Sequence, residues 1–274
     1  MSDDAPIEPP GAEQGEDELT PEGIAADSVR IEEERRELQI QSPGRSVIGS
    51  AIVVSGATFA SRLLGLVRDV LMASLFGFSR EMDAFFIAFT VPNLFRKLFG
   101  EGALSSATIP VLTRYRLRGD NAATRRLLGT LSTLLAVGLG GVTVLVIAAT
   151  WLIPRDWFHD PAKYDLFRKY LSVLLPYVVF ICLAALQAGT LNCWNRFGLP
   201  ALMPALANLV WIIGLVYIWQ SGLRAQPHTA VMVMAAAVLL SGIVQWGFQL
   251  IPMAKLKLIS GPKLALKEPG IRET

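Results

Sequence analysis

The sequence predicts an all-α, polytopic membrane protein whose spanning part is a bundle of six transmembrane helices. The chain of 274 residues is 52% hydrophobic and only 18% charged, with a mean hydropathy of +0.45, whereas soluble domains carry about 25% charge. Six apolar stretches, each near the roughly twenty residues that cross about 30 Å of hydrocarbon, alternate with polar segments. Basic residues lie scattered between these stretches, which argues against nucleic acid as a partner.

The expected helices span residues 47–76, 83–115, 127–152, 170–191, 199–219 and 229–253. Charge interrupts the first helix at Arg62 and Arg68, and Gly65 between them is a plausible site for a bend. In the second helix, Pro92 removes a backbone hydrogen bond and should kink the chain.

The other four helices are more uniformly apolar. A longer polar loop, residues 154–169, leads to the fourth helix, which contains Pro176, and Asn208 falls inside the fifth. The third helix has three glycines that should let a neighbouring helix approach closely: Gly138, Gly140 and Gly141.

The regions that flank the bundle differ from it in composition. Residues 1–46 are rich in Asp, Glu and Pro, cannot build a core and are expected to form a disordered, acidic cytoplasmic tail without a cleavable signal peptide. Residues 47–254 make up the six-helix lobe. Residues 255–274 are expected to be a basic cytoplasmic segment.

Loop lysines and arginines predict the orientation of the chain. Five arginines, at positions 114, 116, 118, 125 and 126, lie at the end of the second helix and in the connection to the third. Arg196 follows the fourth helix, and four lysines follow the sixth. These alternate connections should be cytoplasmic, which places both ends of this chain inside. Arg168 and Lys169, in an opposite loop, weaken the contrast.

Charge is concentrated in the first two helices, between residues 61 and 102. An ionised side chain at the bilayer centre costs about 2.5–3.5 kcal/mol on insertion scales, so several of them indicate a wet cavity and a substrate path. Arginine predominates, and its planar fork of donors matches phosphate oxygens. The pattern indicates an anionic substrate, most simply a phosphate or pyrophosphate. The alternative is that the arginines reach toward headgroups or pair with Asp69 and Glu101.

The same residues carry a family resemblance. In chain order the matching segments are SRLLG (61–65), RD (68–69), DAFF (83–86), PNLFRK (92–97), EGA (101–103) and, further on, LNCWNRF (191–197). By these segments the chain resembles the MurJ/MviN lipid II flippases, which belong to the superfamily of multidrug, oligosaccharidyl-lipid and polysaccharide exporters. The resemblance runs from about residue 47 to the C-terminus.

The resemblance implies a function in peptidoglycan biosynthesis at the bacterial inner membrane. A family member moves lipid II from the cytoplasmic to the outer leaflet by alternating access, so lipid II and membrane lipids are the expected partners. In the family, the positions matching Arg62, Arg68 and Arg96 are cavity arginines that bind the pyrophosphate, and the position matching Asp83 is functionally important. The full set of expected substrate-binding residues is Arg62, Arg68, Asp83, Asn93, Arg96, Lys97 and Glu101.

Family flippases contain two six-helix lobes, whereas this sequence stops just past its sixth expected helix. The resemblance therefore implies that the chain corresponds to the N-terminal lobe alone. Its expected partner is a second lobe, in cis or from another chain.

Three other functions compete with this reading. The chain could belong to an exporter of another anionic lipid-linked saccharide or drug, or be a truncated lobe that transports nothing. A membrane enzyme is least favoured, because Asp69, Asp83 and Glu101 are separated and no intramembrane histidine exists. Cys182 and Cys193 have neither zinc nor redox spacing, so no metal or cofactor is expected.

Overall fold

The computed structural model describes residues 44–100, 103–259 and 261. The chain divides into two compact units, residues 1–51 and 52–274, and the fold presented below is that of the second unit. Most of the predicted acidic tail and of the predicted basic segment lies outside the described residues. Both therefore stay predictions.

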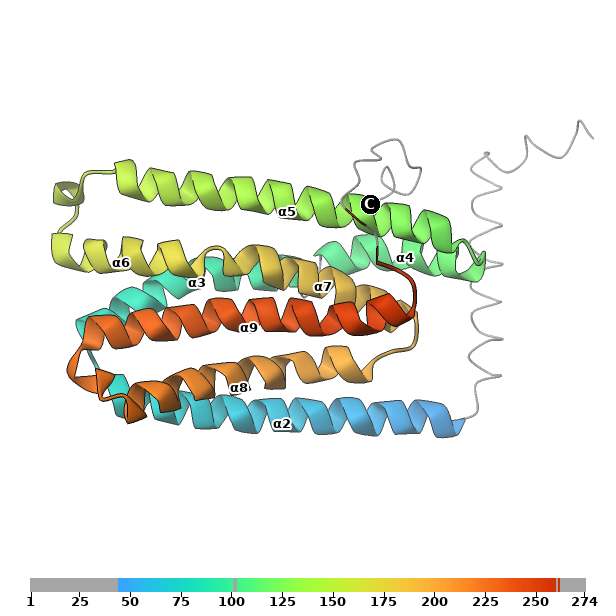
Figure 1. Ribbon diagram of the computed structural model, residues 1–274, viewed down its shortest axis with the longest axis horizontal. Coiled ribbons are helices and arrows are strands. Elements are labelled where there is room, and N and C mark those ends of the chain that lie inside the picture. The colour runs from blue at the N-terminus through green and yellow to red at the C-terminus, as the bar shows by residue number, and fades with distance from the viewer. Residues whose placement is uncertain (1–43, 101–102, 260, 262–274) are drawn as a thin grey trace, which may run out of the picture. The chain divides into compact units, whose positions relative to one another are not determined.

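The described residues form helices joined by turns and short connections, without a strand (Figure 1). This confirms the predicted all-α class. In chain order the elements are α2 (Gly44–Phe76), α3 (Arg80–Gly100), α4 (Ala103–Leu117), α5 (Asn121–Leu152), the 3-10 turn η2 (Arg155–Trp157), α6 (Pro161–Leu174), α7 (Tyr177–Cys193), α8 (Gly198–Gln220), the 3-10 turn η3 (Leu223–Ala225) and α9 (Pro227–Lys255).

Five segments of the described chain are long and apolar enough to cross a membrane, as a polytopic protein requires. The predicted span at residues 83–115 is not among them. It corresponds to α3 and α4, whose charged residues and internal prolines lower the apolar content. The count of six therefore stays a prediction, and the five segments are Ala51–Phe76, Asn121–Leu152, Pro161–Cys193, Gly198–Gln220 and Pro227–Lys255.

Two predictions near the fourth helix are wrong. The polar loop expected at residues 154–169 is helical from Pro161, because the side chain of Asp160 accepts a hydrogen bond from the backbone N–H of Lys163 (3.0 Å) and caps α6. The single helix expected at residues 170–191 is divided between α6 and α7. The break falls at Pro176, which has no N–H to continue the hydrogen-bond ladder.

Helices α7 and α9 lie at the centre of the second unit (Figure 1). Helix α9 packs along α7 and α8, and α3 packs along α6 and α7. Buried apolar side chains form one large cluster, which includes Phe85, Leu171 and Met234, and a smaller one around Leu112 and Leu191. Because lipid is as apolar as these side chains, close packing rather than exclusion from water stabilises such contacts inside a membrane.

Two glycines allow α9 to approach its neighbours closely. A Cβ added at Gly242 would lie 2.6 Å from Cδ2 of Tyr177 on α7, and one added at Gly214 on α8 would lie 2.8 Å from Cβ of Ala237 on α9. The three glycines predicted for this role are on α5, off its buried face. A Cβ on any of them meets no atom within 4 Å in the described part of the chain, so no described helix approaches α5 closely at these positions, and the prediction stays a prediction: Gly138, Gly140 and Gly141.

Replacing Gly242 by alanine should destabilise the bundle, because the ring of Tyr177 must move or α9 must shift away from α7. We expect a loss of about 1–3 kcal/mol, the usual cost of overpacking, seen as a lower thermal unfolding midpoint of the purified chain in detergent. Gly247→Ala is the matched control on the same helix, since its Cβ would meet nothing within 4 Å. Equal midpoints for the two variants would contradict the close packing of α9 on α7.

Candidate functional site

Helix α2 carries two of the predicted site arginines, and its part in the second unit buries few of its apolar side chains. Phe59 and Leu66 expose 72% and 61% of their surface. Arg62 is also exposed, near the middle of the apolar segment Ala51–Phe76. Within the described residues, Arg62 makes no hydrogen bond and no ion pair. An arginine at this depth requires water or a polar surface beside it.

Arg68 lies on the same helix but is held by neighbours. Its Nε and Nη2 donate to Oδ1 of Asp69 at 2.9 and 2.8 Å, and its Nη1 donates to Oδ1 of Asn208 on α8 at 2.8 Å. The side chain of Asp69 is 62% exposed, whereas Asn208 is buried. The guanidinium therefore pairs with one carboxylate on its own helix and one amide on α8.

Asn208 and Trp211 on α8 hold the Arg68 guanidinium by a hydrogen bond and a cation–π contact, respectively. The Asn208 amide also donates to the backbone oxygen of Ser61 (2.9 Å), and it fits beside Gly65, where a Cβ would lie 3.5 Å from Nδ2. The Trp211 ring lies under the guanidinium, with 4.8 Å from the arginine Cζ to the ring centroid. Neither residue was predicted as part of the site, although an asparagine inside an apolar membrane helix is a recognisable signal.

Trp211 also contacts α3 and α9. Its ring meets the rings of Phe89 and Phe85 edge-on, with centroids 5.4 and 6.5 Å apart. Its indole Nε1 donates to Oγ of Ser241 on α9 (3.3 Å). The Trp211 side chain therefore contacts both Arg68 on α2 and the aromatic residues of α3, the helix that carries Arg96.

On α3, the structure brings Asn93 and Arg96 together as their spacing predicts. Nε of Arg96 donates to Oδ1 of Asn93 at 3.1 Å. Arg96 is half-buried, while Lys97 is exposed. Glu101 lies outside the described residues.

Asp83 does not lie with this group. It is in the first turn of α3, thirteen residues before Arg96, which is about 20 Å along a helix axis. Its carboxylate accepts from Nζ of Lys163 on α6 at 3.3 Å. The structure thus places Asp83 at the far end of α3 from the other predicted residues on that helix.

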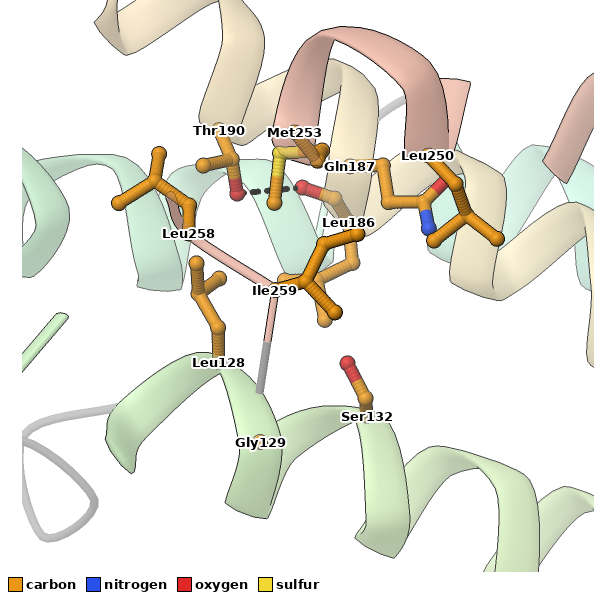
Figure 2. Close-up of a pocket in the computed structure, with 10 residues that line it drawn as sticks. All are labelled: Leu128, Gly129, Ser132, Leu186, Gln187, Thr190, Leu250, Met253, Leu258 and Ile259. Atoms are coloured by element: carbon orange, nitrogen blue, oxygen red, sulfur yellow. Dashed lines mark hydrogen bonds between the residues drawn. The ribbon is translucent and has the colours of Figure 1, made fainter. Parts of the chain in front are cut away.

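A small cavity lies between α5, α7, α9 and the residues after α9 (Figure 2). Its volume is about 60 Å³, which accommodates a few waters but not a lipid headgroup. None of the predicted site residues lines it. The lining residues are Leu128, Gly129, Ser132, Leu186, Gln187, Thr190, Leu250, Met253, Leu258 and Ile259.

Comparison with known proteins finds one family repeatedly. The family model "Lipid II flippase MurJ" matches residues 72–274. The lipid II flippase MurJ of Burkholderia cenocepacia is 36% identical over 231 residues, which cover 81% of this chain and 43% of that protein. The probable lipid II flippase MurJ of Vibrio cholerae is 37% identical over 241 residues, covering 83% of this chain and 44% of that protein.

A solved structure titled "Lipid II flippase MurJ, inward closed conformation" is also similar. It matches with a TM-score of 0.61 and 28% sequence identity, over 81% of this chain and 46% of that one. The chain therefore spans less than half the length of these relatives. The family model begins to match at residue 72, after both α2 arginines.

The Arg68–Asn208 contact should be energetically coupled. In a double-mutant cycle of Arg68→Ala and Asn208→Ala, we expect a coupling of about 1.5–3 kcal/mol, as for hydrogen bonds to charged groups, measured by thermal unfolding in detergent. The control cycle pairs Arg62→Ala with Asn208→Ala and should be additive within about 0.5 kcal/mol. Additivity in both cycles would mean that Asn208 does not hold the guanidinium.

Proposed function

The chain belongs to the MurJ family of lipid II flippases, and we propose that it supplies one lobe of such a flippase, in which Arg62, Arg68 and Arg96 bind the pyrophosphate of lipid II. This lobe would move against a second lobe, in cis or from another chain, so that a shared site near the midplane opens first to the cytoplasm and then to the outside. Lipid II would cross from the cytoplasmic to the outer leaflet of the inner membrane. No chemical bond is made or broken in this reaction.

The observation that carries the proposal is the environment of Arg62. Its guanidinium stays ionised at any physiological pH, and exposing it to hydrocarbon at the middle of a span would cost about 2.5–3.5 kcal/mol. A wet cavity between two lobes removes that cost. It also leaves all five N–H donors of Arg62 free for phosphate oxygens, since no described residue accepts from them.

Arg68 and Arg96 fit the proposal in a different way, because protein groups already orient them. Asp69 and Asn208 accept from three of the five N–H groups of Arg68, which leaves two for a ligand. Arg96 is oriented by Asn93. A side chain that is fixed before the ligand arrives loses less conformational entropy on binding.

The remaining predicted residues would complete the cavity. Lys97, exposed beside Arg96, would add positive charge, and Asn93 and Glu101 would shape the same region. We assign both ends of the chain to the cytoplasm. Support comes from the exposed arginines at the α4–α5 connection: Arg116, Arg118 and Arg125.

The arginines can be tested in a chimera in which this chain replaces the part of the B. cenocepacia flippase that it matches. We expect Arg62→Ala, Arg68→Ala and Arg96→Ala each to abolish complementation of flippase-depleted cells while the protein still reaches the membrane. Lysine at the same positions should rescue only partly, because a point charge lacks the bidentate fork. Growth rate and membrane abundance are the measurements.

Arg125→Ala is the matched control, since Arg125 is an exposed arginine on α5 outside the proposed site. It should support normal growth. If all three site variants also grow normally, the arginines have structural or headgroup-reaching roles and the proposed binding site is wrong.

We expect that this 274-residue chain alone does not move lipid II, because alternating access requires one bundle to move against another. The chain should be reconstituted in liposomes, and the transfer of labelled lipid II across the bilayer followed with time. Lipid transfer indistinguishable from that of empty liposomes is the expected result. Transfer that depends on the protein and disappears with Arg62→Ala would instead indicate that two copies of this chain supply both halves of the site.

A further inference from the structure

Helices α3 and α6 begin next to each other, and their first turns carry matched charges. On α3, Arg80 precedes Asp83 by three residues; on α6, the capping residue Asp160 precedes Lys163 by three. Across the contact, Nε of Arg80 lies 3.8 Å from Oδ2 of Asp160, and Nζ of Lys163 lies 3.3 Å from Oδ2 of Asp83. The two helices therefore present opposite signs to each other at both positions. We call these four residues the α3–α6 seam.

The positions of the two cations support a specific role for the seam. Helix N-termini carry partial positive charge, so Arg80 and Lys163, each in a first turn, are unfavourably placed with respect to their own helices. Each is compensated by a carboxylate on the other helix. Asp160 also caps α6, because it accepts from the backbone N–H of Lys163 at 3.0 Å. Asp160 thus has two roles in the seam: it caps α6, and it pairs with Arg80 of α3.

Asp83 and Arg96, both on α3, point in different directions. On a regular helix, thirteen residues correspond to a rise of about 20 Å and a rotation that leaves the two side chains about 140° apart. A pyrophosphate held by Arg96 cannot also contact Asp83 over that distance. The Asp83 carboxylate instead pairs with Lys163 on α6.

We propose that Asp83 is a positioning residue: through the α3–α6 seam it fixes the rotation of α3 and thereby the direction of Arg96. This inference rests on the proposed role of Arg96 in binding lipid II. Asp83 then matters for transport without touching the substrate. If Asp83 instead bound a cationic part of the lipid headgroup, it would also be needed for transport. Activity would then depend on the negative charge at position 83 alone, and not on the charge at position 163.

Charge reversal across the seam separates these two roles. In the chimera, Asp83→Lys places three cations together, and Lys163→Asp places three carboxylates together; each should lower plating efficiency of flippase-depleted cells about tenfold or more through like-charge repulsion. The double variant D83K/K163D restores opposite signs across the seam. We expect it to recover complementation to within about threefold of the unmodified chimera.

Conservative and control variants accompany the cycle. Asp83→Glu keeps the charge and should retain activity. Asp156→Lys makes the same charge change in η2, outside the seam, and should leave growth unchanged. Membrane abundance is measured throughout, so that a variant that fails to fold is recognised. If Asp83→Lys is inactive and the added Lys163→Asp gives no recovery, Asp83 acts by its own charge and the inference is wrong.

A second readout does not require transport. The thermal midpoint of the purified 274-residue chain in detergent should fall by about 2–4 °C in each single reversal and return in the double. If the midpoint shows this recovery while the arginine variants of the preceding subsection grow normally, the seam stands and the proposed binding site fails. If the two single effects simply add in the double variant, the seam does not exist.

Discussion

The cost of placing an ionised side chain in hydrocarbon governs how α2 is built. Two arginines six residues apart on this helix meet that cost in different ways. Arg68 is compensated inside the protein, by Asp69, the Asn208 amide and the face of Trp211. Arg62 has no such compensation among the described residues, so the cost must be met by water or by groups other than those residues. The same helix therefore carries one arginine that is paired within the protein, Arg68, and one that has no partner among the described residues, Arg62.

The contacts of α2 contrast with those of the helices at the η2 end. There, α6 is fixed to α5 by the hydroxyl of Tyr164, which donates to the backbone oxygen of Thr150 (2.6 Å), and by Arg168, which lies over the ring of Trp151. The α3–α6 seam adds ionic contacts at the same end. Of the five long apolar segments described, Ala51–Phe76 has the smallest buried share, and segments with few buried apolar contacts open more easily than well-packed ones.

The sequence predicted the long apolar helices well and the polar contacts poorly. Helix α8 was placed to within one residue at each end, because Gly198 and the polar residues after Trp219 bound a continuous apolar run. The first part of helix α6, residues 161–169, was taken for a loop, because its cap and its ion pairs make it polar. Asn208 was noticed only as an internal polar residue. Its partner, Arg68, lies 140 residues earlier in the chain, and no local sequence pattern predicts a contact over that separation.

That separation of 140 residues also has a consequence during biosynthesis. At about 5–20 residues per second, a ribosome needs roughly 7–28 s to make α8 after it has made Arg68. Until then, the first of the five described apolar segments, which is also the least apolar of them, has Asp69 beside Arg68 but lacks the Asn208 partner on α8. The contact between Arg68 and Asn208 can therefore form only after α8 has been translated, and the timing of translation becomes part of how this helix bundle is assembled.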